Sequence, residues 1–173
     1  MKKIIRCDPT HASAILAIFN EAIVNSTALY DYQPRTTAMM QAWFDAKTKG
    51  HFPVIGAVND AGELLGFASY GTFRAWPAYK YTIEHSVYVD ARFRGQGVGK
   101  TLLREIITAA TDQDYHVLIG GIDAANAASI ALHRRLGFSP CASIKQAGFK
   151  FGRWLDLEFY QLILSTPVRP IDG

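Results

Sequence analysis

The amino-acid sequence predicts a mixed fold of helices and strands (α+β, or mixed α/β) built around a single twisted sheet flanked by helices. Segments with helical spacing and segments with strand alternation occur in a mixed order along the chain. At 173 residues and 49% hydrophobic residues, the chain is long enough to bury one substantial core. We see no internal repeat, linker or low-complexity segment, so we expect a single domain over residues 1–173.

The first half of the chain predicts two helices and a β-hairpin. A short strand, IIR, precedes a helix for which Asp8 is a natural N-cap. The apolar positions of this helix recur at helical spacing: Ile15, Ile18, Phe19, Ala22 and Ile23. A second helix over residues 36–50 stops at Gly50. The runs FPVIGAV and ELLGFASYG, joined by the turn NDAG, then predict the hairpin.

The second half predicts strands and helices in alternation. An aromatic loop, FRAWPAYK, precedes the long strand YTIEHSVYV, and a glycine-rich loop leads into an apolar helix that begins near Val98. The continuous apolar run HVLIGGI predicts a buried strand. The segment NAASIALHRRLGF predicts a helix that lasts until Gly137, and WLDLEFYQLIL predicts a closing strand.

Charge and composition exclude several classes of protein. The net charge is only +3, and no run of Lys and Arg exceeds two residues, which argues against non-specific binding of nucleic acid. No apolar run approaches the length of a membrane span, and the N-terminus has no signal-like apolar segment, so we expect a cytoplasmic protein. Cys7 and Cys141 lie far apart without metal-ligand spacing and are expected to be free thiols.

The glycine-rich loop, RGQGVGKT at residues 94–101, lies between a predicted strand and a predicted helix. Backbone amides at such a junction point at an anion, and the helix dipole adds partial positive charge there. The Walker A pattern requires a glycine where the chain has Arg94. The dinucleotide fingerprint requires a different glycine spacing. From this stretch alone, a flexible loop that merely needs glycines remains an alternative.

A third phosphate-binding pattern fits the loop. Residues 94–99 have the form [RQ]-x-x-G-x-[GA], which resembles the pyrophosphate loop of the GCN5-related N-acetyltransferases (GNAT). Residues 126–138 resemble a second motif of that family, N-x-x-[AS]-x-x-[LF]-[YH]-x-x-x-G-[FY]. The segments YTIEHSVYV, NAASIALHRRLGF and GFKFGRWLDLEFYQL together resemble the phosphinothricin and methionine-sulfoximine acetyltransferase branch.

The resemblance implies a GNAT fold, acetyl-CoA as co-substrate held between splayed strands, and no metal. It implies acetylation of the α-amine of a small amino acid or analogue, and commonly a homodimer. The implied cofactor contacts are Val87, Tyr88 and Val89 for the pantetheine arm, Gly95, Gln96, Gly97, Val98, Gly99 and Lys100 for the pyrophosphate, and Asn126 and Arg135 from the second motif. Arg135 is alternatively a solvated charge, and Asn126 a helix cap, a role compatible with cofactor contact.

Glu84 is the candidate general base, because the substrate ammonium must lose a proton before it attacks the thioester. It is an acid within an apolar strand, where burial would raise its pKa; a structural ion pair is the alternative. Strict alternation places Glu84 and His85 on opposite faces, so both serve one site only if the strand bulges or splays there. For His85 three roles stay open: substrate binding, proton relay or packing. We expect direct transfer in a ternary complex, because the sequence shows no evident protein nucleophile that could carry the acetyl group.

His133 stands where many members of the wider family carry a tyrosine. It is the candidate acid for the departing thiolate, or alternatively a partly exposed histidine beside the cofactor. Arg74, set between aromatic residues, suits a substrate carboxylate through two parallel hydrogen bonds; a surface arginine is the alternative. The resemblance implies that the amino-acid site is lined by Arg74, Ala75, Trp76, Glu84, His85 and Ser86.

Two rival functions differ from acetylation of an amino acid. Acetylation of a protein N-terminus or a polyamine would leave Arg74 without a role, because these substrates lack a carboxylate near the amine. A non-catalytic module that binds acyl-CoA would tolerate the loss of Glu84, whereas an enzyme would not.

Overall fold

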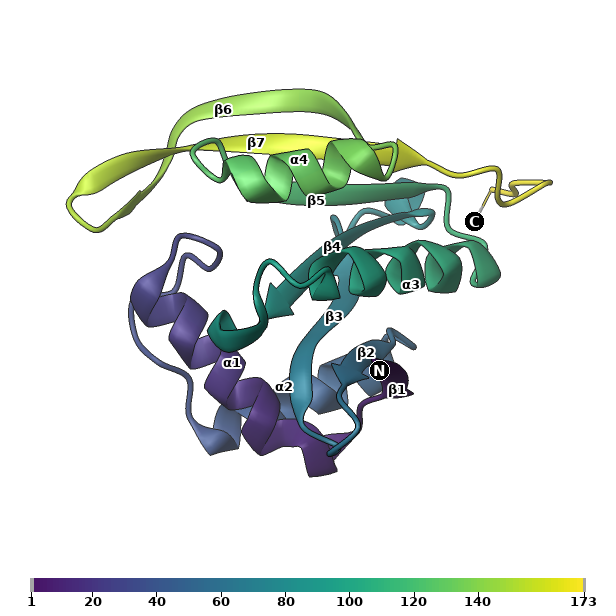
Figure 1. The fold of residues 1–173 in the computed structure, drawn as a ribbon. Helices are drawn as coiled ribbons and strands as arrows, with labels where there is room; N and C mark the ends of the chain where they lie inside the picture. Colours follow the sequence, from purple (N-terminus) through teal and green to yellow (C-terminus); the bar gives the residue numbers. More distant parts are fainter. Residues whose placement is uncertain (1, 173) are drawn as a thin grey trace. The chain divides into compact units, whose positions relative to one another are not determined.

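The computed structural model describes residues 2–172, and within them the chain forms seven strands, four α-helices and three short 3-10 helices (Figure 1). The strands are β1 (Lys3–Arg6), β2 (Val54–Val58), β3 (Leu64–Thr72), β4 (Thr82–Val89), β5 (Val117–Asp123), β6 (Ser139–Lys150) and β7 (Arg153–Ile163). The helices are α1 (Ala12–Asn25), α2 (Thr37–Lys49), α3 (Val98–Asp112) and α4 (Ala127–Arg135), and the 3-10 turns are η1 (Pro9–His11), η2 (Pro77–Tyr79) and η3 (Ala91–Phe93).

The strands belong to one mixed sheet in the order β1-β2-β3-β4-β5-β7-β6. β4 and β5 are parallel, and the pairs β1–β2, β2–β3, β5–β7 and β6–β7 are antiparallel. The predicted class, mixed α/β with a single mixed sheet, is therefore confirmed.

The chain packs into two compact units. The first comprises the chain up to Gly71 together with Ser86–Ile106, and the second comprises Thr72–His85 and the chain from Ile107 onward. β4 and α3 each begin in one unit and end in the other. The single domain expected over residues 1–173 stays a prediction.

The first unit is built on the helices and the hairpin that the sequence predicted. Asp8 accepts a hydrogen bond from Thr10 N at 2.9 Å and so caps η1, which leads directly into α1. The five apolar positions predicted for α1 are the buried residues of that helix. Phe19 packs edge-on against Phe67 of β3 and Tyr88 of β4, with ring centroids 4.9 and 5.1 Å apart. These aromatic contacts fix the C-terminal half of β4 within this unit.

The second unit is built on β5 and β7. These two strands pair without interruption, from Val117 opposite Ile163 to Asp123 opposite Leu157. β4 pairs with β5 over Thr82–Glu84. α4 begins after an Asn126 cap, the alternative role that the sequence offered for this residue, and ends at Arg135, just before Gly137. No helix within the described residues 2–172 is long and apolar enough to cross a membrane.

The sequence reasoning missed β6. This strand is exposed at ten of its twelve positions, so its sequence, SPCASIKQAGFK, shows no apolar alternation. Its pairing with β7 also shifts register twice, between Pro140 and Ala142 and between Ile144 and Gly148. An edge strand with a proline, two irregularities and no buried face has none of the signals by which strands are recognised.

Candidate functional site

The loop between β4 and α3 belongs to the first unit. Gly95 and Gly97 have φ values of +77° and +78°, a left-handed region that favours glycine. A Cβ at Gly95 would meet no atom within 4 Å, so the space beside the backbone is open. The loop ends at Val98, where α3 starts, and the first amides of a helix have no intrahelical acceptor. An exposed set of N–H groups at a helix start is an anion-binding arrangement.

The cations around this loop differ in how they are held. Arg94 pairs with Glu21 of α1, and its Nε donates to the Val89 carbonyl at 3.2 Å. Arg94 therefore ties the loop to α1 and to the end of β4. Lys2 Nζ donates to the Gln96 carbonyl. Lys100, in the first turn of α3, is exposed.

The predicted pantetheine contacts, Val87, Tyr88 and Val89, form the half-buried end of β4 in the same unit. Gly66 on β3 lies against the Tyr88 carbonyl, which a Cβ at that glycine would approach to 2.6 Å. The backbone of β4 is thus fixed from the β3 side. Ser86, at the start of this half-strand, is also half-buried.

Glu84 belongs to the second unit, where its register partner on β5 is Ile119. A Cβ at Gly121 would lie 3.1 Å from Glu84 Oε1, so the absence of a side chain there makes room for the carboxylate. Burial raises the pKa of Glu84, and the positive charge of Arg74 partly opposes this rise. A half-buried carboxylate with a raised pKa has the property that a general base working near neutral pH requires.

Arg74, Ala75 and Trp76 are exposed residues of the loop before η2. The Arg74 guanidinium lies over the Phe73 ring, 5.3 Å from its centroid, and Phe73 in turn contacts Tyr79 at 5.9 Å. No ion pair of Arg74 occurs within residues 2–172, although its charge acts on Glu84. The loop therefore presents a guanidinium on an aromatic support.

His85 faces away from Glu84. A Cβ at Gly120 would approach His85 Cε1 to 2.9 Å, whereas the adjacent Gly121 faces Glu84. Adjacent strand residues point to opposite faces, and the Thr82–Glu84 register shows no shift. The paired segment ends at Glu84 without a bulge, and the contacts at Gly120 and Gly121 place the two side chains on opposite faces, which weighs against His85 as a substrate ligand.

His85 instead pairs with His133 of α4. Their Nε2 atoms are 2.9 Å apart, and the two rings stack with centroids at 5.2 Å. His133 Nδ1 lies 2.7 Å from the Ser129 carbonyl, which can only accept, so Nδ1–H donates there. In the neutral state His133 Nε2 then accepts the proton of His85 Nε2. The remaining nitrogen, His85 Nδ1, is buried and makes no well-formed hydrogen bond within residues 2–172, although the Ile119 backbone still interacts with the His85 ring and partly opposes the fall of its pKa.

Both histidines are buried, His85 at 6% and His133 at 5% exposure. Burial lowers the pKa of His133, and burial together with the neighbouring His133 lowers the pKa of His85 to about 3. The alternative of a partly exposed His133 was therefore wrong. Its role as acid for the leaving thiolate stays a prediction; burial favours the neutral ring, and the one N–H of that ring already binds Ser129.

The start of α4 carries the other two predicted cofactor residues. Asn126 Oδ1 accepts from Ser129 N at 3.1 Å, so Asn126 is the helix cap that the sequence offered as one of its readings. Cofactor contact by the rest of its side chain stays a prediction. Arg135 is exposed in the last turn of the helix, as a solvated charge would be.

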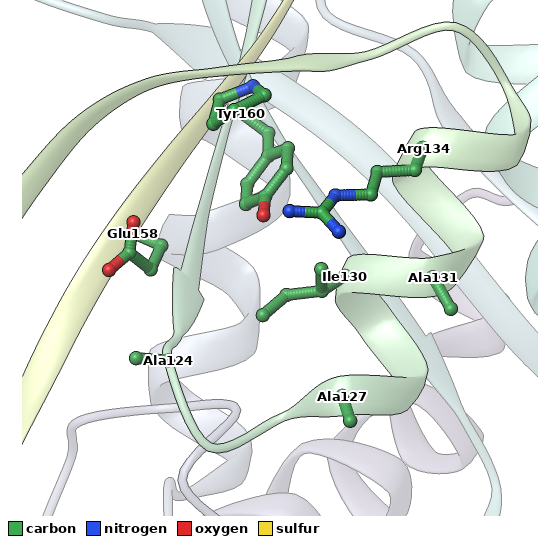
Figure 2. Close-up of a pocket in the computed structure, with 8 residues that line it drawn as sticks. Ala124, Ala127, Ile130, Ala131, Arg134, Glu158 and Tyr160 are labelled. Carbon is green, nitrogen blue, oxygen red and sulfur yellow. The ribbon is translucent and has the colours of Figure 1, made fainter.

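An open pocket of about 730 Å³ lies beside α4 and β7, and no predicted site residue lines it (Figure 2). Ile130 and Arg134 line it from the helix, and Glu158 and Tyr160 line it from the strand. Figure 2 shows the Arg134 guanidinium directed toward Tyr160, whose ring centroid lies 5.7 Å from Arg134 Cζ. This hollow is separate from the residues on which the chemistry was predicted.

The described residues contain no cluster of three or more His, Cys, Asp or Glu side chains that could hold a metal. The expectation that no metal takes part stays a prediction.

Sequence reasoning missed the two glycines of β5 as site residues. Gly120 and Gly121 make room for the histidine pair and for Glu84 respectively. The signal was the GG pair inside the apolar run HVLIGGI, since glycine within a strand marks a close approach of other atoms.

The chain was compared with protein families, and the matching region includes the loop between β4 and α3. Residues 18–138 match the acetyltransferase (GNAT) family. The chain belongs to this family and is an N-acetyltransferase, as the resemblance of its two motifs implied.

One curated relative and two solved structures show which members of the family this chain resembles. A methionine sulfoximine/methionine sulfone acetyltransferase of Pseudomonas paraeruginosa strain PA7 is 49% identical over 151 residues, 87% of this chain and 88% of the relative. A phosphinothricin acetyltransferase from Sinorhizobium meliloti, solved in complex with acetyl-CoA, has a TM-score of 0.94 and 33% identity, covering 99% of this chain and 94% of the other. A ribosomal-protein-alanine N-acetyltransferase from Brucella melitensis has a TM-score of 0.91 and 44% identity, covering 94% and 99%.

Proposed function

We propose that the protein transfers an acetyl group from acetyl-CoA to the α-amine of a small amino acid or analogue of the phosphinothricin, methionine sulfoximine or methionine sulfone type. The observation that carries the substrate class is the 49% identity, over 87% of this chain, with a methionine sulfoximine/methionine sulfone acetyltransferase. Acetyl-CoA as the donor is supported by the S. meliloti neighbour, which was solved with it.

The loop after β4 fits the pyrophosphate of acetyl-CoA. Gly95 and Gly97 lie in conformations suited to close approach of a ligand, and the open space at Gly95 leaves room for it. The amides of residues 95–100 would hold the pyrophosphate, with exposed Lys100 beside them. Val87, Tyr88 and Val89 would hold the pantetheine arm through their backbone. When bound, acetyl-CoA supplies an activated acetyl group as a thioester.

Glu84 would take the proton from the substrate ammonium, directly or through a water. Burial raises its pKa, which brings the carboxylate closer to the range in which a general base works at neutral pH, and the missing side chain at Gly121 leaves room for the carboxylate. Arg74 would bind the substrate carboxylate with its planar guanidinium, on the support of Phe73. No covalent acetyl-enzyme is needed, because Cys7 and Cys141 lie outside both motifs, so the transfer would be direct in a ternary complex. Burial raises the pKa of Cys7 to about 12 and also raises that of Cys141, which disfavours both as nucleophiles.

The proposed activity is tested by measuring coenzyme A release with five kinds of acceptor: methionine sulfoximine, phosphinothricin, free amino acids, spermidine and an alanine-terminated peptide. Turnover with the first two and little with spermidine or the peptide supports the proposal. A chelator in the same assay tests the prediction that no metal takes part, since activity should be unchanged.

A second candidate function is acetylation of a protein N-terminus. The 44% identity with a ribosomal-protein-alanine N-acetyltransferase favours it specifically. Such a substrate carries no carboxylate next to its amine and would leave Arg74 without a partner. If the peptide is acetylated faster than every free amino acid, this second function replaces the first.

A further inference from the structure

Lys47 lies near the end of α2, in the first unit, with its side chain half-buried. Its Nζ donates a hydrogen bond to the Tyr70 carbonyl at 2.7 Å. Nζ also lies 5.5 Å from the centroid of the Trp43 ring and 5.8 Å from that of Phe52. The Lys47 ammonium group thus contacts the Tyr70 carbonyl and lies near the Trp43 and Phe52 rings.

The Lys47 amine has no carboxylate partner within residues 2–172. Burial lowers its pKa to about 8, without a contribution from any neighbouring charge. At pH 7.5 roughly a quarter of such an amine is neutral, against about 0.1% for an ordinary lysine of pKa near 10.4. The neutral form is the one that attacks carbonyl carbons.

Gly71, at the end of β3, leaves the space beside this amine open. A Cβ at Gly71 would meet one atom within 4 Å, Lys47 Nζ at 3.7 Å. The amine therefore lies next to a bare Cα in a half-exposed segment. Apart from Lys47 Nζ, no atom lies within 4 Å of the place that a Cβ would take at Gly71, and we take this side as the one from which an acyl donor approaches.

We propose that Lys47 is a site of self-modification, at which the enzyme's own donor acetyl-CoA acetylates the side-chain amine directly. The neutral Nζ attacks the thioester carbonyl carbon, a C–N bond forms, and the C–S bond breaks. Coenzyme A leaves as the thiolate and takes up the proton that the nitrogen loses. The products are Nε-acetyl-lysine at position 47 and coenzyme A, and no further reactant is needed.

The surroundings of Lys47 tolerate the product. The acetylated nitrogen keeps one N–H, which can still donate to the Tyr70 carbonyl. The modification removes a charge that burial disfavours, and two aromatic rings accept an apolar acetyl group as well as a cation.

Lys49 is a matched control because it lies on the same helix, two residues away, and is exposed. The full-length protein is incubated with acetyl-CoA alone, and peptide mass spectrometry follows acetylation at each lysine over time. We expect Lys47 to be acetylated on the order of 10-fold faster than Lys49 at pH 7.5, because burial lowers the pKa of Lys47 and so leaves more of its amine in the neutral, attacking form. The Lys47 rate should rise with pH and level off above about 8.

Equal or slower acetylation of Lys47 than of Lys49 overturns the proposal, as does a Lys47 rate that keeps rising with pH up to 10. Gly71→Ala provides the second arm, since the added Cβ meets nothing else within 4 Å and the fold should accept it. The variant should slow acetylation of Lys47 several-fold and leave the rate at Lys49 unchanged. An unchanged rate at Lys47 would contradict the proposal that the acyl donor reaches Nζ from the side of Gly71. Mass is the readout, so the result does not depend on which amino acid is the substrate.

Discussion

Glu84 and His85 are neighbours in the chain but lie in different chemical environments. Alternation along the strand predicted their opposite faces, and the contacts at Gly120 and Gly121 confirm them. The pairing of His85 with His133 could not be predicted, because it joins residues 48 positions apart through the packing of α4 within the second unit. Residue types and periodicity thus predicted where side chains point, whereas their partners depended on tertiary packing.

Replacement of Glu84 by Gln tests the base. We expect kcat to fall by a factor on the order of 10² or more, while acetyl-CoA still binds. The base must be ionised to act, so in the wild type the rate should fall as pH falls through the pKa of Glu84. Because burial raises that pKa, the acidic limb should lie above the range of an ordinary glutamate. Near-normal turnover of the variant, with the limb retained, would remove Glu84 from the chemistry.

Arg74→Ala tests whether the guanidinium binds the substrate carboxylate. Truncation of a buried charge pair typically costs about 2–5 kcal/mol, but Arg74 is exposed, so we expect a smaller loss of about tenfold in kcat/KM. Methyl esterification of methionine sulfoximine should impair the wild type strongly and the variant much less. If the ester is equally poor for both proteins, Arg74 does not bind the carboxylate.

The same variant makes a second, independent prediction about Glu84. The charge of Arg74 lowers the pKa of Glu84, so its removal should raise that pKa further. The acidic limb of the pH–rate profile should therefore move to higher pH in Arg74→Ala. A limb that does not move, or moves to lower pH, would show that the two side chains are not coupled.

Among the elements, helices and central strands were predicted well and the edge strand was not. α2 and α4 each carry a cap, Asp8 caps the η1 turn that leads into α1, and the five buried positions of α1 follow from its spacing alone. β6 lacked all such signals because its stability comes from pairing with β7 rather than from a buried face. A strand of this kind is visible only once its partner is known.

The loop between β4 and α3 is tested by Gly97→Val, with Gly62→Val as a matched control. Both glycines have φ near +80°, and both lie in the first unit, but Gly62 is in the turn between β2 and β3. Each variant should lose a similar stability, about 1–2 kcal/mol, because both force an L-residue into the left-handed region. Only Gly97→Val should raise the KM for acetyl-CoA, by about tenfold or more, because it also obstructs the pyrophosphate.

Thermal unfolding and steady-state kinetics of the two variants separate strain from binding. If both variants raise the KM for acetyl-CoA equally, backbone strain alone explains the effect, and the loop between β4 and α3 is not the pyrophosphate-binding loop. If neither does, the pyrophosphate does not approach Gly97.

At the scale of the whole molecule, the exposed surface of the β6–β7 hairpin bears on assembly. The resemblance of the sequence implied a homodimer. Four large apolar side chains of the β6–β7 hairpin are exposed between 45% and 59%: Ile144, Phe149, Phe151 and Trp154. Phe149 and Trp154 are register partners, and their rings contact each other at 5.1 Å. Clustered exposed aromatic residues on a hairpin at the edge of a sheet are typical of a protein interface.

We therefore predict that the protein is a dimer held by this hairpin face. Light scattering after size exclusion should give twice the 19.1 kDa mass of the chain. Trp154→Glu should shift the mass to that of a single chain at micromolar concentration, because dimerisation would bury an unpaired carboxylate among aromatic side chains. Val24→Glu is the control, since Val24 is 52% exposed on α1 and lies outside the hairpin. It should leave the mass unchanged. A wild type of 19.1 kDa at all concentrations would refute the dimer, and a Trp154→Glu variant that stays dimeric would place the interface on another face.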